Sequence, residues 1–98
     1  MQTEHLIPAD SFCIHHNIEL SFIHSLHSTG LIEVVTIEQS IYIDTDQIER
    51  LEKYVRLHVD MGINLEGIEA ISHLLYRVDA LQNSVRDLKN KLRLYESL

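Results

Sequence analysis

A cysteine and four histidines near the start of the chain have the side chains best suited to metal or acid–base chemistry. They are Cys13, His15, His16, His24 and His27. Thiolates and imidazoles are the usual ligands of zinc, and His24 and His27 would share one face of a helix. However, the sequence contains no Cys-x-x-Cys or His-Glu-x-x-His pattern, and structural zinc sites usually need several thiolates. We therefore expect ordinary surface or half-buried histidines, no metal site and no other cofactor.

Other catalytic chemistry has equally little support. Cys13 follows Phe12 on the expected core face of a short helix, where a thiol behaves as a small hydrophobic group. Asp44 and Asp46 form a carboxylate pair, but they stand at an expected helix start, where capping explains them. The three glycines are too far apart to form a phosphate-binding loop. We expect the protein not to be an enzyme.

Charge is distributed very unevenly along the chain. The first 49 residues contain eight acidic residues and no lysine or arginine, whereas the rest contains seven acidic residues and all eight basic ones. A protein that grips DNA needs cations opposite the phosphates, because counterion release supplies much of its affinity. This half is therefore expected to meet a protein partner, with complementary charge steering the encounter.

Length and composition indicate one small globular protein. The chain has 98 residues, of which 45% are hydrophobic and 23% charged. Its one cysteine excludes an internal disulfide and favours a reducing compartment. The chain contains no apolar run long enough to span a membrane, and its first residues lack the pattern of a signal peptide. We expect a cytoplasmic protein with no membrane contact.

Local signals predict a helix-turn-helix in the first thirty residues. A short strand is expected at 5–7, followed by a helix over 11–16 with Asp10 as its N-cap. A second helix is expected over 20–29 and is stopped by Gly30. Two short helices with so tight a connection form a helix-turn-helix.

The next segment predicts a β-hairpin, or wing, followed by a third helix. Residues 31–37 and 41–43 are rich in β-branched side chains and read as its two strands. Asp44 and Gln47 have the spacing of a capping box, and the helix that they open should end near Gly62. Its expected core face consists of Ile48, Leu51, Val55 and Val59.

The last helix, which Asn64 can cap, carries an uninterrupted heptad pattern. Its apolar stripe would be roughly 40 Å long, which is more than a wing and two short helices can cover. Packing along its own domain remains the alternative, but we favour a coiled-coil homodimer, with parallel and antiparallel pairing both open. Residues 1–63 would then form the winged domain, and residues 64–98 a dimerisation helix packed partly on it. The expected dimerisation residues are Ile71, Leu74, Val78, Leu81, Val85, Leu88, Leu92 and Tyr95.

In residue order, the chain resembles the MerR-type winged helix-turn-helix proteins. Their second helix ends in a Gly-Leu-Ile-like motif, found here at 30–32, and their third helix opens with a Tyr-x-Asp-x-Asp-like motif, found at 42–46. Their next break is echoed at 61–68 by Met-Gly-Ile-Asn-Leu-Glu-Gly-Ile. The resemblance implies a mainly α fold with a small β-hairpin wing, followed by a long C-terminal coiled-coil helix. DNA-binding relatives carry an arginine at the position of His24 and Gly-Tyr-Arg at 39–41, where this chain has Gln-Ser-Ile.

Within this superfamily, residues 5–97 are most similar to chaperone modulators of the CbpM type. The likeness is carried by Phe-Cys at 12–13 with His15, Gly-Leu-Ile-Glu at 30–33, Arg-Leu-His at 56–58 and Asn-Leu-Glu-Gly-Ile at 64–68. It implies a non-enzymatic modulator that binds the J-domain of a DnaJ-like co-chaperone and blocks its action on Hsp70.

The candidate partner-binding surface is chosen from charge alone. Its residues are the acidic set Glu33, Glu38, Asp44, Asp46, Glu49 and Glu52, with Ile41 and Tyr42 as apolar anchors. The main alternative is a dimeric DNA-binding transcriptional regulator, although the missing cations argue against DNA as a ligand. A third alternative is a purely structural dimerisation module.

Overall fold

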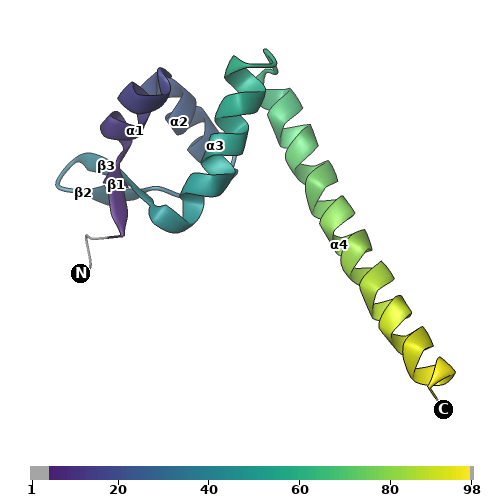
Figure 1. Ribbon diagram of the computed structural model, residues 1–98. Coiled ribbons are helices and arrows are strands. Elements are labelled where there is room, and N and C mark those ends of the chain that lie inside the picture. The colour runs from purple at the N-terminus through teal and green to yellow at the C-terminus, as the bar shows by residue number, and fades with distance from the viewer. Residues whose placement is uncertain (1–4, 98) are drawn as a thin grey trace.

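The protein consists of a small winged-helix head and one long helix that projects from it (Figure 1). The computed structural model describes residues 5–97, and its principal extents are 61 × 36 × 21 Å. This architecture confirms the predicted fold class. We call residues 5–63 the head. The elements in chain order are β1 (Leu6–Pro8), α1 (Ala9–His16), α2 (Leu20–Ser28), β2 (Val35–Ile37), β3 (Ser40–Asp44), α3 (Thr45–Val59) and α4 (Leu65–Glu96).

The first helix begins earlier than its capping signal predicted. β1 runs directly into α1, and Pro8 (φ −58°) is both the last strand residue and the N-cap. No side chain caps this helix, so the prediction that Asp10 is the N-cap is wrong. The early start places Ala9 in the core, where it is only 1% exposed. Asp10 lies instead in the first turn, where its negative charge interacts favourably with the positive end of the helix dipole.

The helix-turn-helix forms where it was predicted. Asn17 ends α1 in the left-handed conformation (φ 56°), and Gly30 follows α2 with φ 82°, which a residue without a Cβ adopts at no steric cost. Ile23 and Leu26 on α2 are completely buried. The two helices therefore share one core, and α2 occupies the position of a recognition helix.

The wing is part of a three-stranded antiparallel sheet with the order β1-β3-β2. β2 is shorter than the predicted strand over 31–37, because Ile32 (1% exposed) enters the core before pairing begins at Val35. A two-residue turn at Glu38 and Gln39 joins β2 to β3, and both residues have positive φ. Positive φ at both positions is the geometry of a type I′ turn, which matches the twist of a hairpin.

The predicted capping box does not form at the start of α3, although Asp44 does cap the helix. Asp44 Oδ1 accepts a hydrogen bond from the Asp46 backbone N–H at 2.9 Å. Gln47 does not reach back to close the box. Its Oε1 atom accepts from the Glu33 backbone N–H at 3.3 Å instead, so the side chain links the entry of the wing to α3.

The core of the head is a single apolar cluster to which most elements contribute. On α3, Leu51 and Val55 are buried as predicted, whereas Val59 is 53% exposed. Tyr54 was not predicted to be buried, but its hydroxyl lies 3.3 Å from Ser72 Oγ on α4, which gives the phenol a polar partner. The buried residues are Ala9, Phe12, Cys13, Ile23, Leu26, Ile32, Ile43, Leu51, Tyr54, Val55 and Ile68.

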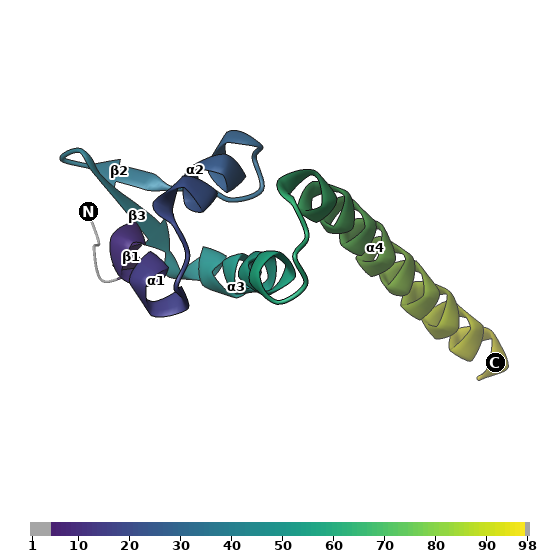
Figure 2. The same cartoon turned by 90° about the horizontal axis from the view of Figure 1, so that it is seen from above.

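The long helix α4 is fixed to the head at its first turns. Asn64 caps it as predicted, with Oδ1 accepting from the Gly67 N–H at 2.9 Å. A Cβ on Gly67 would lie 2.6 Å from Ile63 Cγ2, so the close packing here requires glycine. The next residue, Ile68, is completely buried in the core of the head. Both views show the rest of α4 running away from the head, on the side opposite the β2–β3 turn (Figures 1 and 2).

Candidate protein-binding surfaces

The six predicted partner-binding carboxylates do not form one patch. Glu33 and Glu38 are exposed at the entry and the tip of the wing. Asp44 is half-buried and caps α3. Glu52 is turned toward α1, where its Oε2 atom lies 3.7 Å from His16 Nε2. The structure thus leaves Glu33 and Glu38 exposed on the wing, whereas Asp44 and Glu52 are half-buried.

The remaining two predicted carboxylates, Asp46 and Glu49, line a shallow groove between α3 and α4. The same groove contains Arg50 and Lys53, so its charges are mixed and largely offset one another. Its apolar residues were not predicted as site residues. The signal that could have indicated them is the pair Leu75 and Tyr76, which are exposed apolar residues beside the heptad stripe. The full lining is Asp46, Glu49, Arg50, Lys53, Tyr54, Leu57, Ser72, Leu75 and Tyr76.

The two predicted apolar anchors lie on opposite faces of the sheet. Ile43 on β3 is completely buried, and side chains two residues apart in a strand share a face. Ile41 accordingly packs against the core and is not a free anchor. Tyr42 points to the other face, is partly exposed and stays a candidate anchor.

The surface of α2 carries no lysine or arginine. Its exposed positions hold serines and histidines, including Ser21, His24 and His27. His27 Nδ1 lies 3.4 Å from the Ile32 carbonyl oxygen, so this ring is engaged in closing the end of its helix. The two DNA-reading elements of a winged helix, α2 and the wing, therefore offer no fixed positive charge.

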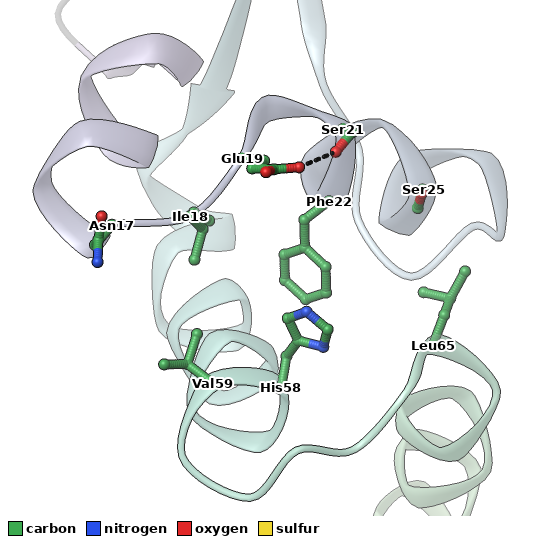
Figure 3. Close-up of a pocket in the computed structure, with 9 residues that line it drawn as sticks. All are labelled: Asn17, Ile18, Glu19, Ser21, Phe22, Ser25, His58, Val59 and Leu65. Atoms are coloured by element: carbon green, nitrogen blue, oxygen red, sulfur yellow. Dashed lines mark hydrogen bonds between the residues drawn. The ribbon is translucent and has the colours of Figure 1, made fainter.

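A hollow of about 560 Å³ lies between α2, the end of α3 and the start of α4 (Figure 3). Figure 3 shows Phe22 reaching from α2 and His58 reaching from α3, so that their rings meet between the helices. The rings are stacked, with centroids 4.5 Å apart and planes inclined by 15°. At the start of α2, Ser21 Oγ donates to Glu19 Oε2 at 3.2 Å. The lining residues are Asn17, Ile18, Glu19, Ser21, Phe22, Ser25, His58, Val59 and Leu65.

The hydrogen bonding of His58 determines which ring nitrogen holds the proton. His58 Nδ1 lies 3.0 Å from the carbonyl oxygen of Ile63. A carbonyl only accepts, so Nδ1 must donate, and in the neutral ring Nε2 is then an acceptor. This contact also ties the end of α3 to the connection with α4. No sequence motif indicated this pairing, because Phe22 and His58 are far apart in the chain.

The predicted dimerisation residues form an exposed apolar stripe along α4. Ile71 is half-buried, and the next seven have exposed fractions between 47% for Val78 and 76% for Tyr95. We call these eight residues the heptad face. Spacings of three and four residues keep such a stripe on one side of a helix. The head thus does not cover the face that the sequence singled out.

The structure does not bring the candidate metal ligands together. Among residues 5–97, no three histidine, cysteine, aspartate or glutamate side chains are grouped so that they could hold a metal ion. The ring of His16 lies between Phe12 (centroids 4.1 Å apart) and His15 (4.9 Å), in aromatic contacts. The helices of this described part also include none that is long and apolar enough to cross a membrane.

Cys13 is buried, and its thiol is protected chemically as well as sterically. Burial raises the pKa of this thiol above its ordinary value of 9.0, and the nearby Asp10 carboxylate raises it further. The fold thus favours the neutral thiol. The contribution of the neutral Cys13 thiol to the stability of the folded state is complete below pH 9. It is lost as the pH rises through the higher pKa that the thiol has in the folded state.

We predict that Cys13 is unreactive in the native protein. Alkylation by iodoacetamide at pH 8, followed by mass spectrometry, should be at least about tenfold slower than in guanidinium-unfolded protein, because the thiolate is the nucleophile. Equal rates in the two states would mean that α1 does not shield this thiol.

Comparison with known protein families assigns the chain to one of them. A family model described as a MerR HTH family regulatory protein matches residues 7–90, which include the whole head except its first residues and most of α4. The chain belongs to the MerR family. No curated protein and no solved structure matches it. This MerR-family protein therefore has the winged fold of a DNA-binding regulator and a reading surface without lysine or arginine.

Proposed function

We propose that this MerR-family protein regulates another protein by binding a basic surface on it, and that it acts without catalysis. The observation that carries the proposal is the charge of the two elements that would read DNA. α2 has no lysine or arginine, and the wing presents Glu33 and Glu38 in exposed positions. Carboxylates at these positions repel phosphates and attract a cationic protein surface.

The partner that fits best is the J-domain of a DnaJ-like co-chaperone. A J-domain presents a basic helix, and the sequence resembles chaperone modulators of the CbpM type that bind such domains. Occupation of the J-domain by the head would exclude Hsp70 by steric competition. Rim carboxylates would speed and orient the encounter, while apolar contacts such as Tyr42 would supply most of the affinity.

We further propose that the active form is a homodimer joined by α4. The heptad face is exposed from Leu74 to Tyr95 in a single protomer. An apolar stripe of this size on a helix is normally covered by another helix. The proposed dimer would place two heads on one molecule.

Charge reversal on the wing tests the proposed partner-binding surface. We predict that Glu33→Lys with Glu38→Lys weakens J-domain binding at least about tenfold at low salt, because both attraction and steering are lost. Isothermal titration calorimetry with a purified J-domain measures the change. Asp44 is left intact because its replacement would remove the α3 cap.

The matched control is Asp79→Lys with Asp87→Lys, which makes the same change in net charge on exposed positions of α4. This variant should bind as the parent does. If both double variants bind alike, the wing is not the partner surface. If the parent shows no J-domain binding, the proposed partner is wrong.

The family match favours a second candidate function, sequence-specific DNA binding as a dimer. Backbone N–H groups would then have to replace the missing cations as phosphate contacts. A mobility-shift experiment at about 50 mM salt separates the two functions. Tight binding that weakens steeply with added salt would favour DNA over a protein partner.

A further inference from the structure

We propose that the hollow between α2 and the α3–α4 connection receives one arginine side chain from a basic protein partner. The proposal adds a site to the proposed function and rests on it for the identity of the partner. The hollow is separate from the wing carboxylates, since its lining comes from 17–25, 58–59 and 65.

The electrostatics of the hollow favour a cation. Among its nine lining residues, Glu19 has the only permanent charge, and none is lysine or arginine. Glu19 is exposed and lies at the N-cap of α2, yet it makes no capping hydrogen bond. The one hydrogen bond described for its side chain comes from Ser21, and a carboxylate with two oxygens can accept several more. A cation entering the hollow would thus find a carboxylate with free accepting capacity.

The shape and aromatic content of the hollow favour a planar cation. The Phe22–His58 stack lies between the two helices, among the other residues that line the hollow (Figure 3). A guanidinium group packs on aromatic rings through cation–π attraction and offers five N–H donors in a fixed plane. The Nε2 atom of neutral His58 and the Glu19 carboxylate are both acceptors for such donors.

The apolar lining suits the rest of an arginine side chain. Ile18, Val59 and Leu65 border the hollow, and Figure 3 places Val59 and Leu65 on opposite sides of the aromatic stack. The three methylene groups of arginine can cover apolar surface while the charged head remains with polar groups. A purely apolar anchor would instead bury the Glu19 charge without an opposite charge beside it, and an anion would be repelled by Glu19.

Packing alone does not account for this set of residues. Stacking Phe22 on His58 joins α2 to the end of α3, and the bond from His58 to the Ile63 carbonyl closes the connection. Neither contact requires a carboxylate at position 19. The polar residues around the stack are available to a ligand, because Asn17, Glu19 and Ser21 are all exposed.

The test uses the full chain and a small probe. N-acetylarginine methylamide is titrated into ¹⁵N-labelled protein, and amide chemical shifts are followed by NMR. The neutral isostere N-acetylcitrulline methylamide is the matched comparison. We expect saturable shifts confined to the hollow for arginine, with a dissociation constant on the order of millimolar. Citrulline should bind at least about fivefold more weakly.

Two variants assign the effect to the hollow. Glu19→Gln should weaken arginine binding at least about fivefold, whereas Glu66→Gln, an exposed change in the first turn of α4, should leave it unchanged. Phe22→Leu keeps an apolar side chain but removes the ring, and it should also weaken binding. The amide spectrum of each variant shows whether it is folded.

The outcomes separate this site from the proposed function. Equal chemical-shift changes with the arginine and citrulline probes would overturn the arginine site. So would arginine-induced changes that are spread over exposed carboxylates throughout the protein. If the J-domain binds and Glu19→Gln leaves both J-domain and arginine binding unchanged, the site is wrong while the proposed function stands. If arginine binds in the hollow but the J-domain does not bind, the site stands and the proposed partner is wrong.

Discussion

Replacing Leu81 and Leu88 with glutamate is expected to convert the proposed dimer into a monomer. These side chains are 63% and 65% exposed in a single protomer and lie in the middle of the heptad face. Burying a leucine contributes about 1.5–3 kcal/mol, and a symmetric dimer would bury four of them at these two positions. The substitutions remove this contribution and place four carboxylates in the interface, so we expect dimerisation to weaken at least about a hundredfold. Sedimentation equilibrium measures the change directly.

The control for this prediction places the same charge on the other side of α4. Asn83→Glu with Asn90→Glu changes two exposed positions opposite the heptad face and should leave the association unchanged. Glutamate is a good helix former, so circular dichroism should show α4 intact in both variants. A wild-type protein that sediments as a monomer would contradict the proposed dimer and leave the heptad face to another partner.

Leu51→Ala is expected to lower the free energy of unfolding of the head by about 3 kcal/mol. Leu51 is completely buried on α3, in the same cluster as Ile23 of α2 and Ile43 of β3. Removing three side-chain carbons forfeits their burial and leaves a cavity that the packed neighbours only partly fill. Urea denaturation monitored by circular dichroism, at one fixed protomer concentration, gives the difference.

Leu94→Ala makes the same chemical change at a position that is 69% exposed and outside the heptad face. It should alter stability by less than about 0.5 kcal/mol. A loss for Leu51→Ala as small as that of Leu94→Ala would mean that α3 is not held by this core.

Residues whose own conformational preference decides the structure were predicted correctly. Gly30 stops α2 with a positive φ, and Asn64 caps α4. Each of these outcomes depends on the side chain and on backbone groups a few residues away. The periodic spacing of the heptad face likewise depends on one helix alone, so the stripe was found from the sequence.

Features that depend on residues distant in the chain were missed. Gln47 bonds to the Glu33 N–H because the fold places the wing beside α3, which the local capping pattern could not indicate. Likewise, the stack of Phe22 on His58 arises only once α2 and α3 are packed together. The acidic set looked like one surface in the sequence, but the turns of α3 direct Glu49 and Glu52 to different sides.

α4 is continuous from Leu65 to Glu96, and Ile68 is buried in the core, so the helix is a spacer that is fixed to the head. A helix of 32 residues spans about 48 Å, so in an antiparallel dimer it would hold the two heads at a set separation. Two copies of a partner on one scaffold would be bound with avidity only if their spacing matched that span. Lengthening α4 by whole heptads would thus change the spacing at which such a dimer binds two partner copies. The affinity of each single head would not change.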